Sequence, residues 1–150
     1  MRAPHAVQVP DTAVRFVDTN VLLYAVSTAP AEARKTAVAR GLLESADLAM
    51  SVQVLQEFYV QATRPTKVDR LRHDQATSLV EAWLRFVVQD NTVPIMLAAA
   101  RTTERHRISY WDSAIIEAAR TLGCEVVLSE DLSDGGDFDG IRIENPFRAL

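Results

Sequence analysis

The sequence predicts an α/β domain of three layers, in which helices cover both faces of a mostly parallel central sheet. Short runs of β-branched and aromatic residues alternate with longer segments of helical periodicity, as in βαβ units. The run Glu125–Leu128 is apolar after its first residue, which is typical of a parallel strand buried on both faces. A chain of 150 residues, 48% of them hydrophobic, is long enough to bury one core.

The first half of the chain is expected to hold two strands and three helices. In chain order, these are a strand at Val14–Val17, a short helix at Val21–Val26, a longer helix from Pro30 to about Glu44, a strand at Leu48–Met50 and a helix from Ser51 to about Thr63. The first strand ends at Asp18-Thr19-Asn20, and each of these residues can cap a helix. Ser51 is a good N-cap, and Arg64-Pro65 ends the next helix because a residue before proline avoids the helical region.

The second half alternates in the same way. The expected elements are a helix at Asp74–Val88, a third strand at Asn91–Val93, a helix at Pro94–Arg105, a helix from Ser109 to about Leu122, the strand Glu125–Leu128 and a last strand at Ile141–Ile143. Gly123 ends the last of these helices, and Asp134-Gly135-Gly136 turns the chain before the last strand. Residues 1–12 are polar and proline-containing, so a flexible leader is predicted there, followed by a single domain over 13–150.

Composition excludes several classes of protein. The lone Cys124 rules out a disulfide framework and a cysteine-rich zinc site, and it indicates a reducing compartment. Met1–Thr12 lacks the apolar region of a secretory signal, and no apolar run is long enough to span a membrane, so a cytoplasmic location is expected. The formal net charge of −4 argues against coating nucleic acid by bulk charge.

Four acidic side chains lie just after predicted strands or on predicted helices, where they could form one site. Asp18 and Asp131 come just after predicted strands, where open α/β sheets bind ligands. Asp112 lies in the first turn of the helix that Ser109 opens, and Glu57 lies on the helix that Ser51 opens. Each also has a plain interpretation. Asp18 can cap a helix, Asp112 fits a capping box, Glu57 shares a solvated face with Gln53 and Gln61, and Glu130 is an equal candidate to Asp131 by spacing.

A site made only of these carboxylates would suit a hard cation. Oxygen ligands without Cys or His favour Mg²⁺ or Mn²⁺ over Zn²⁺. Clustered carboxylates raise one another's pKa, so such a cleft is costly unless a cation occupies it. Mg²⁺ binds phosphate oxygens, and the natural substrate would therefore carry a phosphodiester.

Five segments, which contain these acids or follow them in the chain, stand out: Phe16–Ala25 (FVDTNVLLYA), Val52–Tyr59 (VQVLQEFY), Ser109–Ile116 (SYWDSAII), Leu128–Leu132 (LSEDL) and Asp139–Phe147 (DGIRIENPF). These segments resemble the motifs of PIN-domain ribonucleases, and most closely those of the VapC toxins of type II toxin–antitoxin pairs. They occur in the family's order and extend from Arg15 to the C-terminus. The resemblance departs from the family at the leader Met1–Thr12 and at the acidic loop Ser133–Phe138.

The resemblance implies both a fold and an activity. It implies a PIN-like three-layer domain and a Mg²⁺- or Mn²⁺-dependent endoribonuclease. It also implies a homodimer and a cognate VapB-type antitoxin that blocks the cleft. The implied catalytic and metal-binding residues are Asp18, Glu57, Asp112 and Asp131, with hydrogen-bonding support from Thr19, Asn20 and Ser129. The resemblance thereby selects Asp131 over Glu130.

An acidic nuclease still needs contacts to RNA. Candidates for phosphate contacts are Arg64, Lys67, Arg101 and Arg105. Of the two tryptophans, Trp111 is a candidate for stacking on bases, whereas Trp83 lies on an apolar helical stripe and is expected in the core. Two alternative functions remain open at this stage. One is a PIN-domain nuclease of RNA maturation, and the other is a non-catalytic interaction module whose acids cap helices.

Overall fold

The computed structural model describes residues 14–150, and the predicted leader at residues 1–12 lies outside the described part. In chain order the elements are β1 (Arg15–Val17), α1 (Thr19–Val26), the short 3₁₀ helix η1 (Pro30–Glu32), α2 (Ala33–Leu43), β2 (Leu48–Ser51), α3 (Val52–Ala62), α4 (His73–Trp83), β3 (Val87–Gln89), α5 (Val93–His106), α6 (Tyr110–Thr121), β4 (Val126–Leu128), β5 (Asp137–Phe138) and β6 (Ile141–Glu144). Among residues 14–150, none of these helices has the length and apolar character that a membrane span requires.

All six strands join one sheet, in the order β3-β2-β1-β4-β6-β5. Every neighbouring pair is parallel except β5 and β6, which form an antiparallel hairpin at one edge. The central strand β1 pairs with β2 on one side and β4 on the other, with Arg15 opposite both Leu48 and Val126. The predicted mostly parallel sheet is therefore confirmed.

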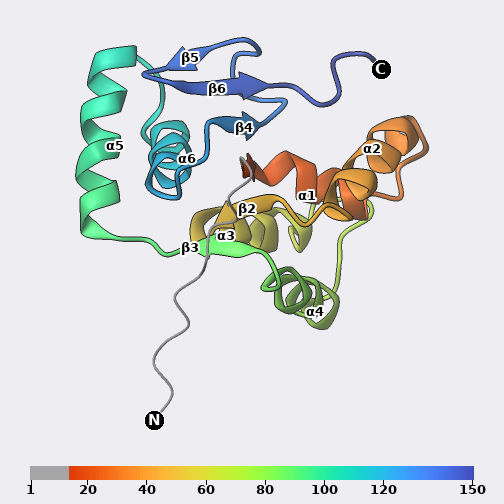
Figure 1. Ribbon diagram of the computed structural model, residues 1–150. Coiled ribbons are helices and arrows are strands. Elements are labelled where there is room, and N and C mark those ends of the chain that lie inside the picture. The colour runs from red at the N-terminus through yellow and green to blue at the C-terminus, as the bar shows by residue number, and fades with distance from the viewer. Residues whose placement is uncertain (1–13) are drawn as a thin grey trace.

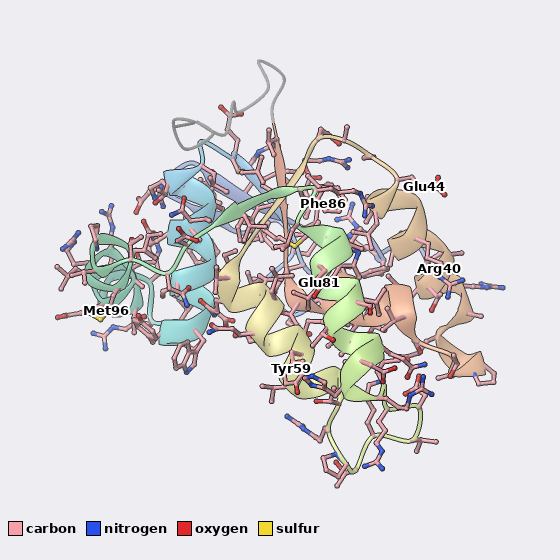
Figure 2. The ribbon with its side chains drawn as sticks, turned by 90° about the horizontal axis from the view of Figure 1, so that it is seen from below. Arg40, Glu44, Tyr59, Glu81, Phe86 and Met96 are labelled. Carbon is pink, nitrogen blue, oxygen red and sulfur yellow. The ribbon has the colours of Figure 1, made fainter. Side chains whose placement is uncertain are left out.

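Helices cover both faces of this sheet (Figures 1 and 2). The chain passes from β1 to β2 to β3 through α1–α4, and then returns across the sheet to β4 through α5 and α6. Because parallel crossovers are right-handed, opposite directions of travel place the two sets of helices on opposite faces. Helix α6 contacts β2, β4 and β6, and α5 packs on α6. The topology consequently reverses between β1 and β4, which is where α/β sheets bind ligands.

The core lies where the central strands meet α1, α3 and α6. Its fully buried side chains include Phe16 of β1, Met50 of β2, Phe58 of α3 and Ile116 of α6. Trp83, only 4% exposed, packs edge-on against Phe58 with ring centroids 4.7 Å apart. The expectation that Trp83 belongs to the core is confirmed.

The largest differences from the sequence prediction lie between α4 and α5. The third strand is Val87–Gln89, so the predicted strand at Asn91–Val93 was wrong, as was the extension of α4 to Val88. The helix ends at Trp83 because the next turn buries Phe86, and the β-branched pair that follows then joins β2. Thr92 instead caps α5, its hydroxyl accepting from the Ile95 amide at 3.2 Å. The two-residue strand β5 was not predicted.

Candidate functional site

Asp18 directly follows β1 and is the N-cap of α1. Its Oδ1 accepts from the Thr19 amide at 2.7 Å, and its Oδ2 accepts from the Ser129 hydroxyl at 2.7 Å. The residue is only 6% exposed, so this carboxylate is largely withdrawn from water. The capping interpretation of Asp18 is thus correct for one oxygen, while the other points to the end of the neighbouring strand.

Ser129 follows β4, which lies beside β1 in the sheet, and is fully buried. Its hydroxyl donates to Asp18, and three donors share the acceptor side of its oxygen: Asn20 Nδ2 at 3.3 Å, the Asp131 amide at 3.2 Å and the Leu132 amide at 3.2 Å. One hydroxyl therefore sets the position of the loop that carries the exposed Asp131 relative to Asp18.

Glu57 enters the same region from α3 and is half-buried. Its Oε2 accepts from the Thr19 hydroxyl at 2.7 Å, and its Oε1 accepts from Gln53 Nε2 at 3.0 Å. Thr19 is therefore bonded to Asp18 through its amide and to Glu57 through its side chain. Glu57 is not the solvated glutamate of the plain interpretation.

Asp112 lies in the first turn of α6, whose N-cap is Ser109. The Ser109 hydroxyl accepts from the Asp112 amide at 3.1 Å, and the Asp112 side chain is half-buried. Gln53 Nε2 also donates to the Trp111 carbonyl at 3.1 Å, which connects α3 to the start of α6. Hydrogen bonds thus link the segments that carry all four predicted acids.

Asp18 and Asp112 each lie within electrostatic range of Glu57 and Asp131. The pKa of Asp18 rises from 3.8 to about 6, chiefly because burial disfavours its charge, and the charges of Glu57 and Asp131 raise it further. Hydrogen bonds from Ser129 and Thr19 partly oppose this rise. The pKa of Asp112 is also raised, first by burial and then by Asp131 and Glu57. These acidic residues, remote in sequence, therefore share one electrostatic environment.

This donor set suits a hard divalent cation. Within residues 14–150, no group of three or more acidic, histidine or cysteine side chains converges closely enough to hold a metal ion by itself. Mg²⁺ does not need three protein ligands, because it is commonly held by one or two carboxylates, water and substrate phosphate. A buried carboxylate with a raised pKa, surrounded by like charges, is the feature that a cation would relieve. The residues present thus fit Mg²⁺ or Mn²⁺.

Nearby acidic residues make other contacts. Glu130 Oε2 pairs with Lys35 Nζ at 2.6 Å, and its other oxygen accepts from the Tyr24 hydroxyl. In the acidic loop, Asp134 accepts from the Asn145 amide and pairs with Arg148, while Asp137 accepts from the Gly140 amide. These loop acids support the local chain, and neither contributes to the electrostatic environment of Asp18 or Asp112.

The predicted RNA-contacting residues fall into two kinds. Lys67 pairs with Asp69 at 2.8 Å, and Arg105 pairs with Asp139 at 3.1 Å. Arg64 and Arg101 are exposed and take part in no ion pair of the described chain. The latter two are therefore the basic side chains more available to a phosphate.

Gln53 is the site residue that sequence reasoning missed. It was assigned to a solvated face together with Glu57, yet it is only 8% exposed and donates to both Glu57 and the Trp111 carbonyl. The spacing of one helical turn between Gln53 and Glu57 was the available signal. Its second partner lies on α6, which no local pattern connects to α3.

Comparison with known proteins bears on fold and family. No curated protein matches the chain. Among solved structures, the DNA-bound VapBC of Salmonella typhimurium is similar at a TM-score of 0.62 and 20% identity, covering 90% of this chain and 99% of that one. The Mycobacterium tuberculosis toxin VapC20, described as cleaving the sarcin-ricin loop, gives a TM-score of 0.62 at 21% identity, covering 78% of this chain and 91% of that one.

A toxin–antitoxin complex from Klebsiella pneumoniae is similar at a TM-score of 0.64 and 19% identity, covering 91% of this chain and 98% of that one. At these identities the likeness establishes the fold. The PIN domain family model matches residues 15–133, which include β1 to β4 and all four acidic residues. The chain therefore belongs to the PIN domain family.

Proposed function

We propose that this protein is a Mg²⁺- or Mn²⁺-dependent endoribonuclease and the toxin of a VapBC-type toxin–antitoxin pair. The observation that carries the nuclease proposal is the acidic site at the β1–β4 edge, where a buried Asp18 shares its electrostatic environment with Glu57 and Asp131. Membership of the PIN domain family supports the same chemistry. The toxin role is supported by the similarity in fold to structures of VapBC and other toxin–antitoxin complexes.

In this proposal Asp18, Glu57, Asp112 and Asp131 form the metal site, in which one or two carboxylates bind the ion directly and the others act through its bound water. A bound divalent ion would lower the pKa of a water molecule and stabilise the leaving oxygen of an in-line displacement. The protein's own hydrogen bonds hold the carboxylates in place: Ser129 and the Thr19 amide orient Asp18, while the Thr19 hydroxyl and Gln53 orient Glu57. Asn20 holds Ser129 and accepts from the Glu130 amide.

The exposed Asp131 marks the side from which a phosphodiester approaches. Arg64 and Arg101 are the proposed phosphate contacts, and Lys67 and Arg105 can join them by exchanging their present carboxylate partners. The proposal also includes a VapB-type antitoxin that covers the site, a homodimer and a cytoplasmic location.

Cleavage assays on folded variants test the nuclease proposal. The wild-type protein is expected to cleave single-stranded RNA with Mg²⁺ or Mn²⁺ and to stop when EDTA is added. Loss of a residue that only orients a metal ligand typically costs about 10- to 100-fold, so Asp18→Asn and Asp112→Asn should each reduce cleavage by at least about 100-fold. The matched control is Asp90→Asn, an exposed aspartate outside the site that should cleave normally.

Circular dichroism and urea unfolding would establish that the variants remain folded. Retained cleavage in folded Asp18→Asn or Asp112→Asn would contradict the assignment. Parallel assays on structured RNA and on DNA separate a toxin-type ribonuclease from a nuclease of RNA maturation or a deoxyribonuclease.

A further inference from the structure

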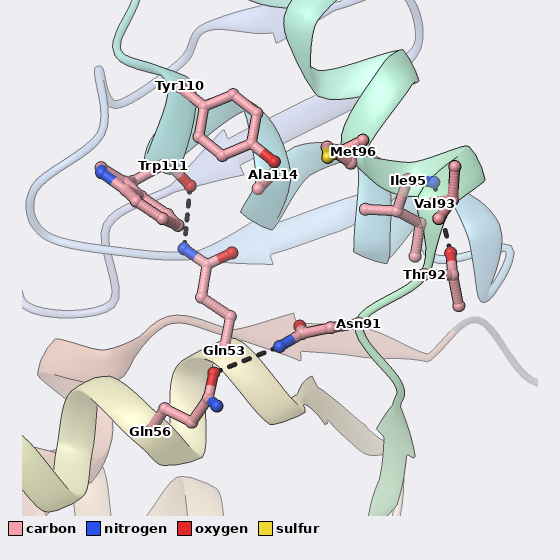
Figure 3. Close-up of a pocket in the computed structure, with 10 residues that line it drawn as sticks. All are labelled: Gln53, Gln56, Asn91, Thr92, Val93, Ile95, Met96, Tyr110, Trp111 and Ala114. Carbon is pink, nitrogen blue, oxygen red and sulfur yellow. Dashed lines mark hydrogen bonds between the residues drawn. The ribbon is translucent and has the colours of Figure 1, made fainter.

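A cavity of about 310 Å³ lies directly beside the acidic site, between the first turns of α3, α5 and α6 (Figure 3). Gln53 forms the shared wall, because the same Nε2 donates to Glu57 on the acidic side and to the Trp111 carbonyl on the cavity side. A group held in this cavity would therefore sit next to the proposed scissile phosphate.

The lining of this cavity is uncharged. None of the ten residues that form it is acidic or basic, although the neighbouring site is strongly acidic. An anionic group such as phosphate would find no cationic partner here, and a metal ion would find no carboxylate. The lining suits a flat, neutral group with hydrogen-bonding edges.

Trp111 supplies a stacking surface for such a group. Its side chain is 64% exposed, an unusual exposure for the largest aromatic residue, and it packs edge-on against Tyr110 with ring centroids 5.0 Å apart. An edge-on partner fixes the indole ring without covering both of its faces. Exposed aromatic faces are what proteins use to stack unpaired bases.

Two amides provide a hydrogen-bonding edge across the cavity. Asn91 Nδ2 donates to Gln56 Oε1 at 3.2 Å, as Figure 3 shows, which orients both side chains. Within residues 14–150, this bond leaves Gln56 Nε2 and Asn91 Oδ1 without a side-chain or backbone partner. The two amides therefore keep hydrogen-bonding capacity of both kinds for a base, whose edges carry donors and acceptors of their own.

We infer that this cavity is a nucleobase subsite: it takes one unstacked base of single-stranded RNA, adjacent to the scissile phosphate, with the base on Trp111 and its edge toward Gln56 and Asn91. The inference rests on the proposed ribonuclease function and deepens it. It makes Trp111 a binding residue and Gln56 and Asn91 specificity residues, and it explains how an acidic protein selects RNA without a large basic surface.

Tryptophan fluorescence tests this directly, because Trp83 is buried and Trp111 is the exposed indole. The probe is a short single-stranded oligoribonucleotide that the wild-type protein cleaves, added to the full-length Asp18→Asn protein with Mg²⁺. Saturable quenching is expected, and it should disappear when one position beside the scissile phosphate carries an abasic ribose. Trp111→Phe in the same background should show no quenching.

Affinity measured by anisotropy of labelled RNA provides the second readout. Trp111→Ala should weaken binding by about tenfold or more, the usual effect of removing a stacking aromatic, and Trp111→Phe should retain most of the affinity. Leu84→Ala is the matched control, since Leu84 is a similarly exposed apolar residue (56%) outside the cavity, and its affinity should be unchanged. Gln56→Ala and Asn91→Ala should reduce the discrimination between oligomers that differ only in that base.

Equal quenching by the abasic oligomer, or unchanged affinity in Trp111→Ala, would overturn the inference. So would sedimentation showing that Trp111→Ala converts a dimer to a monomer while RNA binding stays independent of the base, because the cavity would then face a second copy of the chain. Failure of the proposed function gives a different result: the wild-type protein then cleaves no oligoribonucleotide with Mg²⁺ or Mn²⁺, while a scan of single abasic positions along a bound oligomer still finds one position whose base is needed for quenching.

Discussion

Asp18 follows the central strand, is only 6% exposed as a residue, and its carboxylate accepts two hydrogen bonds at 2.7 Å. Those bonds do not offset its burial, because the pKa still rises from 3.8 to about 6. Without a cation, the ionised form of this residue lowers the stability of the folded protein at neutral pH. A metal site explains why such a group stands in an otherwise well-satisfied core.

The first prediction concerns the pH dependence of stability. Between pH 4 and 6 the folded protein holds a proton on Asp18 that the unfolded chain releases, so this residue's contribution to the free energy of unfolding falls as pH rises through that window. Asp18→Asn removes the effect. In the absence of divalent ions the variant should be more stable than wild type by about 2 to 3 kcal/mol at pH 7.5 and equally stable near pH 4.

Urea unfolding from pH 4 to 8 measures this difference, with Asp90→Asn as the control that should follow wild type. A difference that does not change with pH, or a variant less stable than wild type at pH 7.5, would contradict the role assigned to Asp18.

Sequence patterns located the acidic residues but not their surroundings. Asp18 and Asp131 were found because polar residues that follow parallel strands meet at one sheet edge. Spacing alone did not separate Asp131 from Glu130. In the structure Glu130 pairs with Lys35 and Tyr24, whereas Asp131 contributes to the electrostatic environment of Asp18. That distinction depends on which way the loop turns, and the loop is set by the buried Ser129 hydroxyl.

At the scale of elements, α3 connects the two halves of the site. Its first turn holds Gln53, which bonds to Glu57 on its own helix and to the Trp111 carbonyl on α6. The order of the strands places these two helices on opposite faces of the sheet, and the Gln53–Trp111 bond joins them. Gln53 is therefore a positioning residue for both acidic segments.

Gln53→Ala tests this connection. The variant should stay folded and reduce metal-dependent RNA cleavage by about 10- to 100-fold, as expected when a partner that orients a metal ligand is lost. Higher metal concentration should partly restore the rate. Gln61→Ala, on the same side of α3 but one turn beyond Glu57, is the matched control. Equal activity in the two variants would show that Gln53 has no positioning role.

A second connection joins α6 to the edge hairpin. Arg120 donates to the carbonyls of Asp139 and Phe138 at 2.8 Å and 2.7 Å, and its Nε pairs with the buried Glu117 at 2.9 Å. The hairpin lies opposite the end of α6 because the left-handed residues Asp139 and Gly140 turn the chain there.

Arg120→Ala is expected to lower the free energy of unfolding by about 2 to 4 kcal/mol, because it strands the Glu117 carboxylate in the interior. Arg148→Ala breaks a pair whose arginine side chain is 78% exposed and should cost less than about 1 kcal/mol. Chemical denaturation of both variants measures the contrast, and similar small losses in both would contradict it.

Hydrophobic periodicity predicted most helices well, whereas the short strands were predicted less well. The position of β3 was missed because the apolar stripe of α4 continues in sequence into Phe86, Val87 and Val88. Burial of Phe86 in a turn and pairing with β2 decide that boundary. The two-residue strand β5 exists only through its pairing with β6 and has no pattern of its own.

At the scale of the whole molecule, topology assembles the site. Chain reversal between β1 and β4 brings Asp18 beside Ser129, and the two sets of helices deliver Glu57 and Asp112 from opposite faces. The strand order could not be read from the sequence, because alternating strands and helices are compatible with several orders of a parallel sheet. The site acids also differ from other acids near the C-terminus. Glu130, Asp134 and Asp139 each form an ion pair with a basic side chain, whereas the four site acids form none within residues 14–150.

Mn²⁺ binding followed by electron paramagnetic resonance tests the central claim most directly. Wild-type protein should bind Mn²⁺ at neutral pH and lose affinity below about pH 6, where Asp18 takes up a proton. Asp18→Asn and Asp112→Asn should each weaken Mn²⁺ binding by at least about tenfold, because losing even a residue that only orients a metal ligand typically costs that much affinity. The control Asp90→Asn should bind Mn²⁺ like wild type. Unchanged Mn²⁺ affinity in folded Asp18→Asn and Asp112→Asn, or no binding by the wild-type protein, would contradict a metal centre at this sheet edge.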